Sequence, residues 1–63
     1  MHEYEPYVGQ PLEVLTKALQ REQKTIRIVK LNGATCIVTN DVQVNRLNIV
    51  VNNNIVLAVI GFG

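Results

Sequence analysis

The residues whose side chains could do chemistry are few in this 63-residue chain, and they are scattered. It has one cysteine, Cys36, and one histidine, His2, and it has no serine. Nucleophilic catalysis needs a nucleophile, a base and an enclosing pocket, and a structural zinc site needs about four Cys, His or carboxylate ligands. Neither set occurs here at a suitable spacing. The sequence therefore argues against an enzyme and predicts no metal and no other cofactor.

The single cysteine also limits how the domain can be stabilised. One thiol cannot form a disulfide within the chain. No histidine or basic run lies near Cys36 to activate it, so we interpret this residue as a small apolar filler rather than a reactive thiol. With neither disulfide nor metal, one domain over residues 1–63 must be held together by packing alone.

Charge and hydropathy exclude several classes of partner. The formal net charge is +1, and the six basic residues form no cluster, which argues against nucleic acid as the main partner. No apolar run approaches the length of a membrane span, and the N-terminus has no signal pattern. We expect either a cytosolic chain or a mature form whose leader was removed. Cys36 weakly favours a reducing compartment.

The N-terminal third is predicted to hold an extended arm and a helix. Residues 1–10 mix charge, Pro and Gly, and Tyr4 and Tyr7 are positioned to pack on the edge of a core. Residues 11–23 are expected to form the helix, with Pro11 at its first position. Apolar residues recur there at the three- and four-residue spacing of a single helix face: Leu12, Leu15, Ala18 and Leu19.

Three strands are predicted in the remaining sequence. Residues 25–31 are rich in β-branched side chains, and Asn32-Gly33 is a turn signal. Residues 46–52 alternate cleanly, with Leu47, Ile49 and Val51 on one face. The run Asn52-Asn53-Asn54 tolerates positive φ and predicts a turn. Residues 55–60 are then expected to pair back as an antiparallel edge strand, with Gly61 and Gly63 ending it loosely.

The segment 33–44 lies between the two best strands. Irregular loops of about this length are uncommon in small domains, and they are usually functional or disordered. Its apolar residues are β-branched, which restricts their side chains and favours an extended backbone. The sequence therefore predicts a stiff loop. A further short strand within it fits the periodicity about equally well.

The order of residues in this loop resembles the reactive loop of the potato inhibitor I family of serine protease inhibitors. The similar elements are Ile37-Val38-Thr39-Asn40-Asp41 and, four residues on, Asn45-Arg46-Leu47. Tyr7-Val8-Gly9-Gln10, the strand 26–31 and the tail 59–63 also resemble family elements in order. The sequence Arg46-Leu47-Asn48 is also similar to that of a related group of small microbial inhibitors.

The resemblance implies a fold and a mechanism. The fold is α+β: one helix packed on a small mixed β-sheet, with a long extended reactive loop between two parallel strands. The Asn40-Asp41 bond would be presented to a serine protease as if it were a substrate, with Asn40 entering the primary specificity pocket. The implied reactive-site loop comprises Ile37, Val38, Thr39, Asn40, Asp41 and Val42.

Support for this loop is assigned to Arg46, Asn48 and Gln43. Arg46 lies on the strand face opposite the apolar residues, where its guanidinium can donate to the Asp41 carboxylate and the Thr39 oxygen. The alternative is a solvated surface arginine. Asn48 and Gln43 stand where family members often carry further arginines, so the loop is expected to be less firmly held.

Asn40 is the most informative difference from the family pattern, because chymotrypsin- and subtilisin-directed family members usually have a large apolar residue there. A small amide would underfill an apolar pocket. We therefore expect weak binding to chymotrypsin, better binding to subtilisin-like or elastase-like proteases, and none to trypsin. Two alternatives remain: a non-inhibitory protein-binding module of the same fold, and an assembly domain that pairs through the edge strand 55–60.

Overall fold

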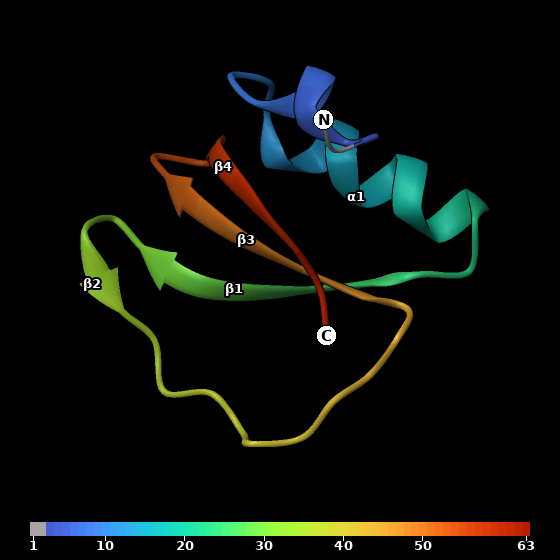
Figure 1. Cartoon of the computed structure of the whole chain (residues 1–63). Helices are drawn as coiled ribbons and strands as arrows, with labels where there is room; N and C mark the ends of the chain where they lie inside the picture. Colours follow the sequence, from blue (N-terminus) through green and yellow to red (C-terminus); the bar gives the residue numbers. More distant parts are fainter. Residues whose placement is uncertain (1–2) are drawn as a thin grey trace.

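The fold is α+β, with one helix lying across one face of a mixed four-stranded sheet (Figure 1). It is seen in a computed structural model, which describes residues 3–63. The elements in chain order are η1 (Glu5–Tyr7), a short 3₁₀ helix, then α1 (Leu12–Arg21), β1 (Thr25–Leu31), β2 (Ala34–Thr35), β3 (Arg46–Asn52) and β4 (Ile55–Phe62).

The sheet has the order β2-β1-β3-β4, so β1 and β3 are its two central strands. They run parallel, and Thr25 lies opposite Arg46 while Arg27 lies opposite Asn48. β2 and β4 pair antiparallel on either side. The expected parallel strands flanking the long loop are therefore present. The expected antiparallel edge strand is present too, although it begins at Ile55 and continues to Phe62.

Two tight turns join the antiparallel pairs at the positions that the sequence predicts. Asn32 and Gly33 have φ of 51° and 84°, and Asn53 and Asn54 have φ of 51° and 64°. Consecutive positive φ values suit two-residue hairpin turns, because their twist matches that of the strands. The first turn leads into β2, so the alternative of a further strand is correct for two residues. The backbone is then irregular over 36–45.

The core lies between the helix and one face of the sheet. Alternate residues of β3 point into it, as the alternation predicts, because successive strand residues face opposite sides. Two leucines of α1 meet them, as the helical spacing predicts. The side chains with at most 1% exposure are Leu15, Leu19, Leu47, Ile49, Val51 and Val56.

The helix is shorter at both ends than the predicted range 11–23. Pro11 caps it with an extended ψ of 142° instead of occupying its first turn. At the other end Gln23 takes a left-handed φ of 59°. The N–H groups of Gln23 and Lys24 then bond back to Gln20 and Leu19 at 3.1 and 2.9 Å. This pattern closes a helix and turns the chain away from it, so the helix ends at Arg21.

The prediction of an extended N-terminal arm is wrong for the described residues, because Glu5–Tyr7 forms a 3₁₀ turn. Tyr4, just before it, is only 4% exposed. Its ring meets Phe62 edge-on, with the centroids 5.7 Å apart. The expected packing of a tyrosine at the core edge is therefore present, although a turn delivers it. His2 lies outside the described residues.

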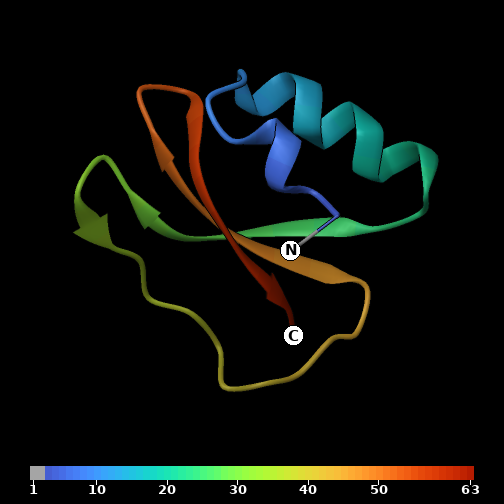
Figure 2. The ribbon, with the colours of Figure 1, turned by 45° about the horizontal axis from the view of Figure 1, so that its top comes forward.

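The helix and the long loop lie on opposite sides of the sheet, and the C-terminal end of the chain lies between the sheet and the loop (Figures 1 and 2). The prediction that Gly61 and Gly63 end the chain loosely is wrong. Gly61 is paired within β4, and the N–H of Gly63 donates to the Arg46 carbonyl at 3.0 Å.

Candidate functional site

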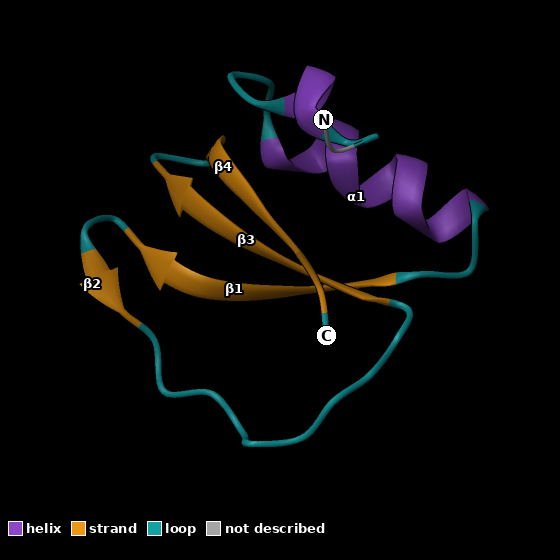
Figure 3. Ribbon diagram, in the orientation of Figure 1, coloured by secondary structure: helices purple, strands orange, loops and turns teal. Residues whose placement is uncertain are grey.

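The loop 36–45 leaves β2, passes along the sheet face that the helix does not cover, and enters β3 (Figure 3). Every residue from 37 to 45 is exposed. Both ends of the loop are attached to β1. The Cys36 N–H donates to the Val29 carbonyl at 3.0 Å, and the Thr25 N–H donates to the Asn45 carbonyl at 2.9 Å. The loop is therefore open to a partner along its length but anchored where it begins and ends.

Arg46, the first residue of β3, reaches across to the middle of this loop. Its Nη2 donates to the Asp41 carbonyl at 2.9 Å, and the guanidinium contacts both Asp41 carboxylate oxygens at 3.3 Å. Its Nε donates to the Gly63 carbonyl at 3.2 Å. The residue is only 8% exposed. The expected contact between Arg46 and Asp41 is therefore present, and a solvated surface arginine is not what the structure contains.

The expected donation from Arg46 to Thr39 is absent, because another arginine holds that position. Arg27 Nη1 donates to the Thr39 carbonyl at 3.0 Å and lies 3.7 Å from Asp41 Oδ1. Arg27 was not identified as a site residue from the sequence. The available signal is its parity: Arg27 alternates with Ile26 and Ile28, so it faces the side opposite the core. On the adjacent strand β3, Arg46 and Asn48 face the same side, and Arg27 lies opposite Asn48. The two arginines therefore lie on the same face of the sheet.

Asn48 supports the loop through Arg27 rather than by touching it. Its Oδ1 accepts from Arg27 Nε at 2.7 Å. Its Nδ2 donates to the carbonyls of Gly61 and Gly63 at 3.0 and 3.1 Å. The amide is 8% exposed. Asn48 thus orients an arginine on the neighbouring strand.

Removing the Asn48 amide is expected to destabilise the fold. In Asn48→Ala, two backbone carbonyls and the Arg27 Nε lose a partner in a buried setting, which costs about 1–3 kcal/mol. Chemical denaturation followed by circular dichroism measures this loss. Asn52→Ala, an exposed position at the end of the same strand, is the control and should change stability by less than about 0.5 kcal/mol. Equal losses in the two variants would contradict the prediction.

Besides Arg27, which lies 3.7 Å from Oδ1, three side chains form hydrogen bonds with the Asp41 carboxylate. The Thr39 hydroxyl donates to Oδ1, Gln43 Nε2 donates to Oδ2 at 3.2 Å, and Arg46 contacts both oxygens. The Thr39 hydrogen bond, followed by that of Arg46, holds the pKa of Asp41 well below its ordinary value. Gln43 adds a smaller effect in the same direction. The expected contact of Gln43 with the loop is therefore present, and Asp41 is the centre of the polar network.

The network is expected to loosen in acid. Because folding lowers the pKa of Asp41, its stabilising contribution is complete above the unfolded pKa of about 4 and is lost as the pH falls through the folded value. The measurement is the free energy of unfolding of the parent chain and of Asp41→Asn between about pH 6 and pH 2. The difference between them should shrink below about pH 4. Because folding also lowers the pKa of Glu22, only this difference isolates Asp41. A difference that stays constant to the lowest pH would contradict the prediction.

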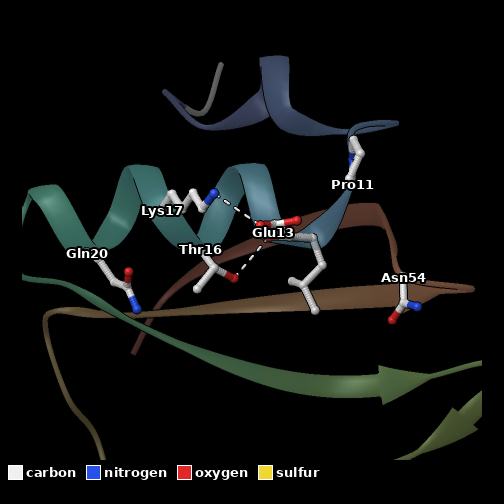
Figure 4. Close-up of a pocket in the computed structure, with 7 residues that line it drawn as sticks. Pro11, Glu13, Thr16, Lys17, Gln20 and Asn54 are labelled. Carbon is white, nitrogen blue, oxygen red and sulfur yellow. Dashed lines mark hydrogen bonds and ion pairs between the residues drawn. The ribbon is translucent and has the colours of Figure 1, made fainter.

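A concave surface lies beside α1, away from the loop (Figure 4). Within its lining, Lys17 contacts Glu13 at 3.1 Å, and the Thr16 hydroxyl donates to the Leu12 carbonyl at 2.9 Å. Among residues 3–63 there is no cluster of His, Cys, Asp and Glu side chains that could hold a metal ion. Within the same range, no helix is long and apolar enough to cross a membrane.

The loop and the two arginines beneath it are therefore the candidate site. Comparison of this chain with protein-family models, curated proteins and solved structures finds no match in any of the three.

Proposed function

We propose that this protein is a serine protease inhibitor that acts by a substrate-like mechanism and presents the Asn40-Asp41 bond to the protease. One observation carries the proposal. The carbonyl oxygens on either side of Asn40 are each held by an arginine, Thr39 by Arg27 and Asp41 by Arg46. Asn40 itself is exposed between them. A segment restrained in this way is suited to being bound without being released.

Restraint matters because a protease binds its substrate in an extended form. A loop that is already extended can add beside the cleft as a short strand. If its backbone is fixed beforehand, little conformational entropy is lost on binding, and affinity rises accordingly. The β-branched residues of the loop and the arginine contacts both act in this direction.

The same contacts oppose hydrolysis. Attack by the protease breaks the bond between the Asn40 carbonyl carbon and the Asp41 nitrogen, leaving an acyl-enzyme and a new amine on Asp41. Arg46 holds Asp41 on the β3 side of the cut, and Arg27 holds Thr39 on the β1 side. An amine kept beside the acyl group has a high effective concentration, so religation competes with water and with release.

Two buried or half-buried arginines supply the cross-links that a disulfide would otherwise provide. Cys36 is a free cysteine, and the chain contains no other. The side chains of Arg46 and Arg27 are 10% and 20% exposed. Hydrogen bonds to charged groups are stronger than neutral ones, and partial exclusion of water strengthens them further.

Titration against a panel of proteases tests the proposal. Subtilisin, pancreatic elastase, chymotrypsin and trypsin are each incubated with increasing amounts of the chain, and residual activity is followed over hours. We expect stoichiometric inhibition of subtilisin or elastase, weaker inhibition of chymotrypsin, and none of trypsin, whose pocket would lack a cation. Mass spectrometry of the incubated chain should detect a cut only between Asn40 and Asp41. Rapid cleavage without inhibition of any of the four would contradict the proposal.

The second candidate is a non-inhibitory protein-binding module with the same fold. Asn40 favours it, because a small amide at the centre of the loop fills an apolar pocket poorly. In that case the restrained loop would bind another protein without entering an active site. Rapid cleavage of the loop by proteases of the panel, with no inhibition, is the result that favours this candidate.

A further inference from the structure

The loop exposes apolar side chains that the fold itself does not use. Ile37 is 103% exposed, Val42 81% and Val44 78%. None of them belongs to the core or packs against it. Because they are exposed to water, these side chains do not give the fold the stabilisation that burial of an aliphatic side chain provides. The arginine contacts with the Thr39 and Asp41 carbonyls hold the backbone between Ile37 and Val42.

Their positions bracket the bond that we propose is presented. Ile37 lies three residues before Asn40, and Val42 lies two residues after it. Of Ile37, Asn40 and Val42, Asn40 offers the least apolar surface, because its side chain ends in an amide. A partner that covers the whole loop would therefore gain most of its apolar contact away from the central residue.

We infer that the protein selects its protease through apolar subsites on both sides of the scissile bond, one for Ile37 and one for Val42, and that the primary pocket contributes little. This inference rests on the function proposed above and names the kind of protease concerned. Such an enzyme has aliphatic surfaces for the fourth residue before the cut, counting Asn40 as the first, and for the second residue after it. Its primary pocket tolerates a small polar side chain.

Stiffness is the competing explanation for these residues. A β-branched side chain favours extended backbone whether or not a partner touches it. Threonine separates the two roles, because it keeps the branch at Cβ while replacing apolar surface with a hydroxyl. Ile37 and Val42 are exposed, so Ile37→Thr and Val42→Thr are expected to fold like the parent.

The experiment measures inhibition constants for the protease of the panel that the parent chain inhibits best. Ile37→Thr and Val42→Thr should each weaken inhibition about tenfold or more, because each removes apolar contact that contributes a factor of about ten or more to the affinity. Asn40→Ala should change it less than about threefold. Val14→Thr, a β-branched position on α1 that is 44% exposed, is the matched control and should leave inhibition unchanged.

The outcomes separate the two levels of the argument. If Asn40→Ala weakens inhibition more than either threonine variant, selection lies in the primary pocket and this inference is overturned, while the proposed function stands. If both threonine variants inhibit like the parent, the side chains serve stiffness only, and the inference is likewise overturned. If the parent inhibits no protease of the panel, the proposed function fails and the inference fails with it.

Discussion

Arg46→Ala is expected to convert the proposed inhibitor into a substrate. The variant loses the hydrogen bond to the Asp41 carbonyl, both contacts with the carboxylate and the bond to Gly63. The Asp41 side of the scissile bond is then free to move after cleavage. A displacement of about 1 Å is enough to cost a reacting group about a hundredfold in rate. We therefore expect inhibition to weaken about a hundredfold or more, and the Asn40-Asp41 bond to be cut and not resealed.

Loop cleavage must be distinguished from loss of folding, because Arg46 is only 8% exposed. Thermal unfolding defines a temperature at which the variant is still folded, and the cleavage rate by the inhibited protease is measured there. Arg46→Lys keeps the charge but cannot hold the carbonyl and the carboxylate together with a planar fork, so it should lie between the alanine variant and the parent. Arg21→Ala, at an exposed helix position, is the control. If a folded Arg46→Ala variant is cleaved as slowly as the parent, Arg46 does not restrain the loop as proposed.

Asn40→Leu is expected to strengthen binding to subtilisin and to chymotrypsin. Leucine buries an aliphatic side chain in an apolar primary pocket where asparagine would bury an amide. Burial of a side chain of this size contributes about 1.5–3 kcal/mol, which corresponds to a gain in affinity of about 10- to 100-fold. Residue 40 is exposed and lies between the two tethered carbonyls, so the substitution leaves the loop support in place.

Inhibition constants for the parent and Asn40→Leu against both enzymes measure this gain. Asn45→Leu is the control: it introduces the same side chain at an exposed position five residues later in the chain, at the anchored end of the loop. An unchanged affinity in Asn40→Leu would mean that residue 40 does not enter the primary pocket. An equal gain in both variants would mean that leucine acts through general hydrophobicity rather than through a pocket.

The elements that local pattern determines could be predicted from the sequence. The ranges 25–31 and 46–52 coincide with β1 and β3, because β-branched composition and strict alternation are strong signals. Both two-residue turns follow from residues that accept positive φ. Alternation places Arg46 on the face away from the core, which by itself fits a solvated arginine equally well, and its contact with Asp41 was predicted from the resemblance of the loop to the inhibitor family.

The parts that depend on neighbouring strands could not be predicted in the same way. Arg27 joins the site only because β1 and β3 are parallel and Arg27 lies opposite Asn48. A single strand reveals which face a residue takes, but not which residue stands beside it. The Gly63 carbonyl, which accepts from Arg27, Arg46 and Asn48, has no side-chain signature at all. The 3₁₀ turn over Glu5–Tyr7 is likewise fixed by the burial of Tyr4 against distant residues.

The position of the loop has a consequence for a molecule that has been nicked at its centre. A cut after Asn40 yields two peptides, one carrying α1 and β1 and the other carrying β3 and β4. The core is shared between them, with Leu15 and Leu19 from the first and Leu47 and Ile49 from the second, so separating the two peptides would expose core side chains of both. The two halves of a nicked molecule would therefore be held together only by non-covalent contacts, among them the β1-β3 ladder.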